Sequence, residues 1–438
     1  MSDSLRRDWC GTPAHPFNRR SFLSRSLAAA GVTFAADMTV LDVLRSRAFA
    51  ERLKHSGKRV LLLWLAGGPS QLETWDPKPG RPTGGPFRSI GTSVPGIRIS
   101  ELMPKMAQRL KNTAIIRSLN TKIGDHGGAT KVMHFGRRPE ANLKFPDIGA
   151  IVTRELGRMD SNVPDNVAFY SATEGRGNAV GRPGFLGARY APIFLTTDNI
   201  PENLARLDTI SELDHQQRAD LRDLISAGFA RGRKSNVISS HNEAYARVRG
   251  IMASEKLFDI SQESQKSREM YGPSLFGQQT LIARRLVEAG TPFVKVSRAW
   301  WDSHGQNFET HLELVPELDH VMSTLLDDLD QRGLLDHTLV ITMGEFGRTP
   351  NINGSLGRDH FANAWSVTLS GCGIRGGTVY GESDEDGQTV KDGEVGAPEL
   401  FATIFQALGI DHKREYQVDA RPVPLTDPGA EPIQAVLA

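Results

Sequence analysis

The segment from Arg59 to Ala66 constrains the fold of this chain most strongly. It is a short, nearly continuous apolar run that ends at Gly67-Gly68-Pro69. Strands of a parallel sheet have this composition, because helices cover the sheet on both faces and bury every side chain. The run therefore predicts the central strand of an α/β domain.

The segments that follow alternate between helices and strands. Several of the expected helices begin at a polar N-cap such as Asp147 and end at a glycine such as Gly157 or Gly290. The expected strands are 59–66, 113–119, 293–296 and 338–343, and the expected helices are 147–156, 274–289, 318–329 and 401–408. This alternation predicts a mostly parallel sheet with helices on both faces, in three layers.

The stretch 160–270 has a different composition. It contains glycine-rich loops followed by polar helical segments around 212–227 and 242–262. We interpret it as a helical insertion or cap within one domain that spans 51–430. No internal repeat is evident, and the length suits one large α/β domain with insertions or two domains.

The first 50 residues have the features of an export signal. Asn18-Arg19-Arg20-Ser21-Phe22-Leu23 is an arginine pair followed by Phe and Leu, a short apolar stretch runs over 27–34, and Ala48-Phe49-Ala50 offers a cleavage site. An adjacent arginine pair in such a segment indicates the twin-arginine (Tat) route, with the Tat translocon as a partner during export. The structural alternative is an amphipathic helix with an incidental arginine pair.

Charge and cysteine content narrow the classes of function. The chain has 52 Lys and Arg against 51 Asp and Glu, and without residues 1–50 the balance is 45 against 47. Near neutrality and the lack of a basic stripe argue against nucleic-acid binding. Outside residues 1–50, Cys372 is the one cysteine, so no disulfide framework is expected. No later apolar run is long enough for a stable membrane span, and we expect an exported protein, periplasmic or extracellular.

Acidic residues and histidines follow the expected strands. Ligands of α/β sheets bind beyond the carboxyl ends of the strands, so these residues mark the expected site. They are Glu73 and Asp76 after the first strand, Asp125 and His126 after the second, Asp302 and His304 after the third, and Glu345 and Arg348 after the fourth, followed by Arg358, Asp359 and His360. Carboxylates with imidazoles suit one or two divalent ions, with Zn, Mn, Mg and Ca all open.

Taken singly, each of these residues has a structural alternative. Asp302 is also suited to an Asx turn, Glu345 to a salt bridge with Arg348, and His126 to capping the helix after it. The joint placement at four strand ends is what favours a metal or catalytic site. Six other histidines are expected to be solvated, namely His215, His241, His311, His320, His337 and His412.

The motifs in this order resemble the alkaline phosphatase and sulfatase superfamily. More narrowly, GGPSQLETWDPKP, WDSH, GEFGRTP and GRDH resemble an uncharacterised family of exported, sulfatase-like bacterial proteins known as a domain of unknown function. The resemblance covers nearly all of 59–412. It implies an alkaline phosphatase-like fold and a metal centre. The segment 395–404 resembles the terminal helix motif of the superfamily.

The resemblance also implies roles for single residues. Asp302 and His304 match the mid-chain Asp and His metal ligands, His360 matches the late ligand histidine with Asp359 beside it, and Glu345 stands where an Asp is usual. The nucleophile position is occupied by His126, which leaves a phosphohistidine, a metal ligand or a lost activity open. The first-strand Asp is missing, and Glu73 is the candidate substitute, ahead of Gln71 and Asp76.

The function expected from these residues is hydrolysis or transfer of a phosphate or sulfate ester outside the cytoplasm. In this reading His126 is the metal ligand or the nucleophile, and Arg348 or Arg358 neutralises the anionic substrate. The metal would be held by Glu73, Asp302, His304, Glu345, Asp359 and His360. An ordinary sulfatase mechanism is not expected, because no Cys-x-Pro-Ser-Arg motif exists. The alternative is an exported, non-catalytic protein that binds a metal or a glycan, and a lyase or isomerase remains open.

Overall fold

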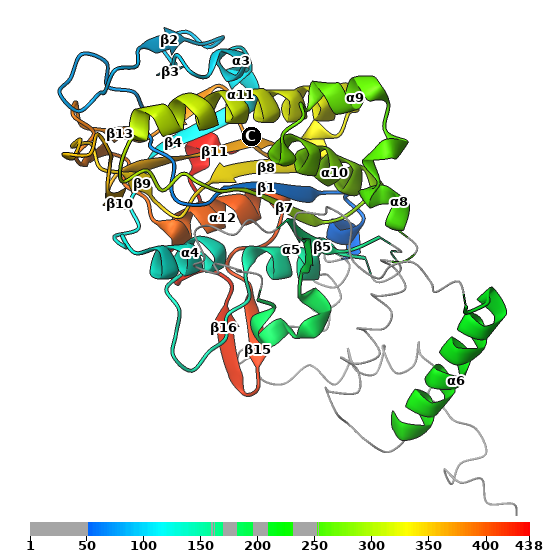
Figure 1. Cartoon of the computed structure of the whole chain (residues 1–438). Coiled ribbons are helices and arrows are strands. Elements are labelled where there is room, and N and C mark those ends of the chain that lie inside the picture. Colours follow the sequence, from blue (N-terminus) through cyan, green and yellow to red (C-terminus); the bar gives the residue numbers. More distant parts are fainter. Residues whose placement is uncertain are drawn as a thin grey trace, which may run out of the picture. The chain divides into compact units, whose positions relative to one another are not determined.

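A central sheet of eight strands organises the fold (Figure 1). In this computed structural model its order is β12-β4-β11-β8-β1-β7-β5-β6. The strands are β1 (Arg59–Leu65), β4 (Thr113–Leu119), β5 (Asn166–Phe169), β6 (Ile193–Leu195), β7 (Phe293–Arg298), β8 (Thr338–Met343), β11 (Trp365–Gly371) and β12 (Thr378–Tyr380). Only β11 runs antiparallel to its neighbours β4 and β8. The predicted mixed α/β class with a mostly parallel sheet is confirmed.

The structure describes residues 51–158, 161, 163–169, 182–195, 209–230, 252 and 254–438. Residues Arg52–Ala438 form one compact unit, which contains every strand of the central sheet. The predicted export signal lies outside the described residues. No helix among the described residues is long and apolar enough to cross a membrane.

Helices cover both faces of the sheet, as the buried strand β1 requires. Its residues alternate between two apolar cores, with Val60 and Leu62 in one and Leu61 and Leu63 in the other, all fully buried. The first core holds α4 (His126–Phe135), α5 (Ile148–Leu156) and α12 (Ala397–Leu408), and the second holds α3 (Pro104–Ala107), α10 (Leu275–Ala289) and α11 (Asn307–Gln331) (Figure 1). Replacing Leu61, Leu62 or Leu63 by alanine is expected to lower the free energy of unfolding by about 2–5 kcal/mol.

The capping residues predicted from the sequence lie at the ends of the helices. Asp147 accepts a hydrogen bond of 2.8 Å from the amide of Ala150, and Ser274 accepts one of 3.1 Å from the amide of Gly277. These side chains replace missing backbone partners in the first turns of α5 and α10. Gly290 ends α10 in the left-handed region at φ 107°.

Part of the stretch expected to be an insertion belongs to the sheet. Strands β5 and β6 extend its edge beyond β7 in parallel. The same stretch contains α6 (Glu212–Ala230), α8 (Glu255–Phe258) and α9 (Gln265–Met270), and α6 lies where a polar helix was predicted. The second polar helical segment was predicted over 242–262, and residues 242–251 and 253 of it lie outside the described residues.

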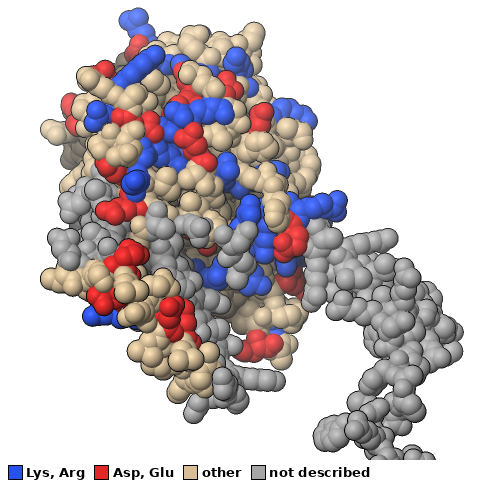
Figure 2. Space-filling model, turned by 90° about the vertical axis from the view of Figure 1, so that its right-hand side faces the viewer, with Lys and Arg blue, Asp and Glu red and all other residues tan. Residues whose placement is uncertain are grey.

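Short elements complete the described part of the chain. The two-stranded sheets are β2 (Ser89–Gly91) with β3 (Arg98–Ser100), β9 (Gly347–Arg348) with β10 (His360–Phe361), β13 (Glu382–Ser383) with β14 (Val390–Asp392), and β15 (Glu415–Val418) with β16 (Arg421–Pro424). The 3₁₀ turns are η1 (Leu110–Asn112), η2 (Gly184–Leu186), η3 (Ala188–Tyr190), η4 (Ile260–Gln262), η5 (Leu335–His337) and η6 (Gln434–Val436). On the face shown in Figure 2, acidic and basic side chains are interspersed, as the balanced charge predicts.

The strand directions bring distant residues to one edge. Strands β1, β4, β7 and β8 run the same way, so their carboxyl ends meet there. Strand β11 runs the opposite way and therefore begins at that edge, which places β10, just before it, beside the other four strand ends.

Candidate metal centre

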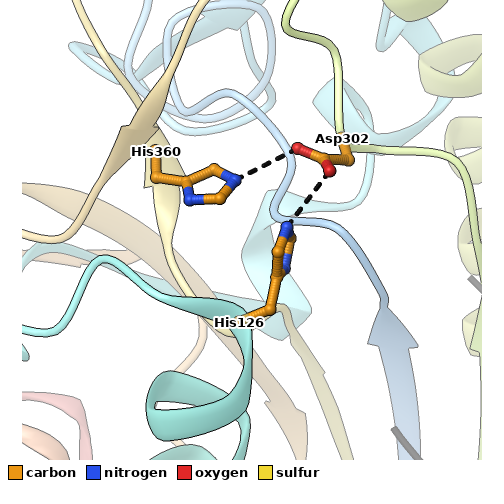
Figure 3. Close-up of side chains that lie close together, drawn as sticks. All are labelled: His126, Asp302 and His360. Carbon is orange, nitrogen blue, oxygen red and sulfur yellow. Dashed lines mark hydrogen bonds and ion pairs between the residues drawn. The ribbon is translucent and has the colours of Figure 1, made fainter. Parts of the chain in front are cut away.

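Three histidines and an aspartate converge at this edge. His126 is the first residue of α4, whose N-cap Asp125 accepts a hydrogen bond of 2.7 Å from the amide of Gly128. Asp302 and His304 follow β7, and His360 lies in β10. Figure 3 shows the side chains of His126 and His360 pointing at Asp302 from two sides. The sequence prediction thus named residues that the fold brings together.

The distances define a compact set of donor atoms. Asp302 Oδ2 lies 3.1 Å from His126 Nε2, and Asp302 Oδ1 lies 3.2 Å from His360 Nε2. One donor atom each from His126, Asp302 and His360 lies within 4.8 Å of the other two. His304 adjoins the set, with its Nε2 3.1 Å from Asp302 Oδ1 and 3.0 Å from His360 Nε2. We call these four residues the His/Asp cluster.

Glu345, directly beyond β8, contacts the cluster through His126. Its Oε1 lies 2.8 Å from His126 Nδ1 and accepts a hydrogen bond of 2.9 Å from the amide of Gly67. Gly67 has φ 113°, and a Cβ there would lie 2.6 Å from the amide nitrogen of Asp302, so only glycine fits. The other oxygen, Oε2, is buried and has no hydrogen-bond partner among the residues that the structure describes.

Asp359 touches the cluster from its solvent side. Its Oδ1 lies 2.8 Å from His304 Nδ1, and the side-chain amide of Asn353 donates to it at 3.3 Å. The hydrogen bond from His304 lowers the pKa of Asp359. Asp359 therefore sets the tautomer and orientation of His304, as carboxylates do behind metal-bound histidines.

Opposing influences act on the titration of His126 and Asp302. Burial lowers the pKa of His126, but its contacts with Asp302 and Glu345 outweigh this and raise the pKa to about 9. Burial raises the pKa of Asp302, and the bonds from His126, His360 and Arg348 reverse this and hold it well below the usual range. Without a metal, His126 is an imidazolium between two carboxylates at neutral pH.

Arg348 is buried behind Asp302. Its Nη2 lies 2.7 Å from Asp302 Oδ1 and also bonds the carbonyl of Gly67, and its Nε donates to the carbonyl of Gly68 at 2.9 Å. Gln71 holds the arginine backbone, donating to its carbonyl at 2.8 Å and accepting from its amide at 2.9 Å. The guanidinium is fully buried, so it fixes Asp302 and the first loop rather than facing solvent.

The structure places Glu73 with Arg358, away from solvent. Arg358 Nη2 lies 2.7 Å from Glu73 Oε1, both side chains are fully buried, and Asn307 donates to Glu73 Oε2 at 3.0 Å. Both oxygens of Glu73 thus have protein partners. Asp76, the weaker candidate, lies 3.2 Å from the ammonium of Lys78 and also accepts from Ser383.

The expectation that His311 is solvated is wrong. His311 is fully buried in α11, where its Nε2 accepts a hydrogen bond of 3.0 Å from the amide of Ser70 and its Nδ1 lies 2.8 Å from the carbonyl of Asn307. It therefore supports the first loop from behind. Its spacing from Leu314, Val315 and Leu318 is that of one helix face, a signal that was available in the sequence.

The donor set fits a divalent metal ion. Neighbouring ligand atoms in a tetrahedral zinc shell lie about 3.3 Å apart, and the contacts of Asp302 with three imidazole nitrogens span 3.1–3.2 Å. His304 Nε2 and His360 Nε2 face each other at 3.0 Å, which suits two lone pairs directed at one ion. Oε2 of Glu345, which has no partner among the described residues, is a further buried oxygen beside the His/Asp cluster that could bind the ion.

The protein is therefore an α/β protein with histidines and carboxylates gathered at the carboxyl edge of its sheet. The chain belongs to the family described as Protein of unknown function (DUF1501), whose model matches residues 57–437. This confirms the narrow resemblance read from the motifs. No match was found among curated proteins.

The solved structures that match this chain have low sequence identity to it. A sulfatase from Pseudoalteromonas sp. is 13% identical, with 82% of this chain and 72% of that chain covered at a TM-score of 0.39. The lipoteichoic acid synthase LtaP from Listeria monocytogenes is 9% identical, with 86% and 79% covered at a TM-score of 0.39. The phosphonate monoester hydrolase of Agrobacterium radiobacter is 12% identical, with 84% and 74% covered at a TM-score of 0.33.

Proposed function

We propose that this chain is a metal-dependent hydrolase or transferase for phosphate or sulfate esters that acts outside the cytoplasm. The observation that carries the proposal is the His/Asp cluster, in which donor atoms of His126, Asp302 and His360 lie within 4.8 Å of one another. Such a concentration of imidazole and carboxylate groups at the carboxyl edge of an α/β sheet is where the chemistry of these folds is performed.

His126, Asp302, His304 and His360 are the residues that would hold the ion, with Glu345 as a further donor. Three imidazoles favour zinc or a similar transition metal over magnesium or calcium, which prefer oxygen ligands. When bound, such an ion polarises a phosphoryl or sulfuryl oxygen and stabilises the negative charge that develops there.

Glu345 orients His126 both for metal binding and for nucleophilic attack, the two active roles that the sequence leaves open. With Oε1 at 2.8 Å, the carboxylate keeps a proton on Nδ1, so Nε2 is the nitrogen that gives up its proton when it binds a metal or attacks a substrate. That nitrogen is the one directed at Asp302. Nε2 therefore serves as the metal ligand or as the nucleophile, and in both cases Glu345 fixes the ring and raises its basicity.

The buried arginines and Glu73 act as positioning residues in this proposal. Arg348 holds Asp302 by an ion pair of 2.7 Å, and the Glu73–Arg358 pair joins the first loop to the loop before β10. Since both guanidinium groups are fully buried, neutralisation of an anionic substrate is assigned to the ion rather than to them.

Export is part of the proposal and rests on the sequence motif around Arg19-Arg20. The Tat route carries folded proteins, which suits a metal centre assembled from segments as far apart as residues 126 and 360. The anionic ester or glycan substrate would then be met in the periplasm or outside the cell.

Metal analysis and an ester panel test the proposal. The purified full chain is expected to hold at least one divalent ion and to hydrolyse some member of a panel of aryl phosphates, phosphodiesters and aryl sulfates. Asp302→Asn should lose both metal and turnover, while Glu382→Gln, at an exposed site, should keep both. Neither metal nor turnover in the parent would refute the proposal. Metal without turnover would favour the non-catalytic binding role.

A further inference from the structure

A strained, exposed tryptophan stands beside the His/Asp cluster. Trp300 has φ 77°, a conformation that a bulky residue with a Cβ adopts only at a cost. Its side chain is 57% exposed, whereas the neighbouring Ala299 and Trp301 are buried. Since Asp302 is only two residues further along the chain, the two Cα atoms lie within about 7 Å of each other.

Positive φ at non-glycine residues is concentrated in the two loops that carry Asp302, His304 and His360. Of the five non-glycine residues with positive φ in the described part of the chain, three lie there: Trp300, Gln306 and Leu356. The loops are tied together, since the amide of Gln306 donates to the carbonyl of Ser355 at 3.1 Å and the amide of Asn307 to that of Leu356 at 2.9 Å. Leu356 is 58% exposed.

The positive φ and the exposure of Trp300 both count against a role in core packing. Glycine or asparagine adopts positive φ at lower cost, and a side chain more than half exposed contributes little to the core. Strain that persists beside a site, on a side chain that solvent reaches, indicates selection for a contact with a ligand. An indole ring offers a large, rigid apolar face for such a contact.

We propose that Trp300 is a substrate-binding residue that stacks on the ring of the substrate. The inference rests on the proposed function and deepens it, since it assigns the substrate class: the alcohol part of the ester is a ring with a flat apolar face. A sugar and an aryl alcohol both have this chemistry. The anionic group would lie at the His/Asp cluster and the ring on Trp300.

Fluorescence of the full chain tests binding without requiring turnover. The other tryptophans of the described residues, Trp64, Trp75, Trp301 and Trp365, are at most 4% exposed. Subtracting the signal of Trp300→Phe isolates Trp300, because Trp9 is common to both proteins. We expect phenyl phosphate or glucose 6-phosphate, with their sulfate analogues, to protect Trp300 from acrylamide quenching. Glycerol 3-phosphate and inorganic phosphate should not. Protection by the phenyl or by the glucose compounds distinguishes the two kinds of ring.

Kinetics and stability of substituted proteins complete the test. Trp300→Gly is expected to raise KM for the preferred ring ester on the order of 3- to 10-fold with kcat little changed, which matches the usual energy of an aromatic contact. Its unfolding midpoint should stay equal or rise, because glycine relieves the strain. Trp300→Phe should restore most of the affinity. Leu312→Ala, at a side chain with the same exposed fraction, 57%, on α11, should change nothing.

The results separate this inference from the proposed function. Turnover of ring and acyclic esters with equal KM in the parent and in Trp300→Gly would overturn the inference and leave the hydrolase standing. Ring-specific protection of Trp300 without turnover of any ester would support the inference and count against the hydrolase. A Trp300→Gly protein that is less stable and binds as before would show a purely structural role and refute the inference.

Discussion

Replacing Glu73 by glutamine tests whether this residue supports the fold or binds the metal. The carboxylate is fully buried and lies 2.7 Å from the guanidinium of Arg358, which is also fully buried. Glu73→Gln removes one charge of the pair and leaves the other buried without compensation. Such a loss costs about 3–5 kcal/mol, because a buried cation can neither be hydrated nor readily give up its proton.

Urea unfolding is the suitable assay for this change. For a unit of this length, an unfolding entropy of about 2.1 cal/mol/K per residue makes each kcal/mol worth only about 1 °C in Tm. The midpoint in urea responds more clearly, and its slope shows whether the denatured state has changed. Metal content is measured on the same samples and is expected to equal that of the parent.

Two further proteins sharpen the result. Glu73→Leu combined with Arg358→Met removes both charges and should recover most of the stability, as apolar replacements of buried ion pairs often do. Glu382→Gln breaks an exposed pair with Lys391, 2.9 Å apart, and should cost less than about 1 kcal/mol. Loss of metal from Glu73→Gln with unchanged stability would refute the structural role and restore Glu73 as a ligand.

The site and the leader give three other predictions. His126→Gln should abolish turnover and lower metal affinity at least 10-fold, because it removes the ring nitrogen that faces Asp302; full activity would exclude both roles of His126. In the metal-free protein the pKa of His126 is raised to about 9, so the stability that its imidazolium provides is complete below about pH 6.5 and is lost as pH rises through 9. Metal must displace that proton, so apparent affinity should rise about tenfold per pH unit up to about pH 9, with proton release in calorimetry; a flat profile would contradict this. Arg19→Lys with Arg20→Lys should trap the full chain in the cytoplasm, as fractionation would show, and undiminished export would contradict the Tat assignment.

The sequence predicted the centre of the fold more closely than its edges. The apolar runs of β1, β4 and β8 and the caps of α5 and α10 gave those elements nearly to the residue. Strands β5 and β6 have only four and three residues, too few for a periodic pattern. The antiparallel direction of β11 is set by its pairing with β4 and β8, which no local pattern encodes.

The site was predictable for residues at strand ends and not for the groups behind them. Because parallel strands end at one edge, His126, Asp302 and Glu345 could be placed together before their contacts were known. Arg348 and Arg358 were expected to face a substrate, yet each is buried against a residue far away in sequence, Asp302 and Glu73. From the sequence alone, a charged residue in a loop is expected to be exposed, because the partner that permits its burial is known only from the structure.

The most direct test of the proposed metal centre is an anomalous difference map from crystals of the full chain grown with zinc or manganese. A metal centre at the His/Asp cluster predicts a peak within about 2.0–2.3 Å of His126 Nε2, Asp302 and His360 Nε2. His304 should lie at the same ion or beside it. A metal peak elsewhere, or none at the His/Asp cluster at saturating metal, would contradict the proposed centre.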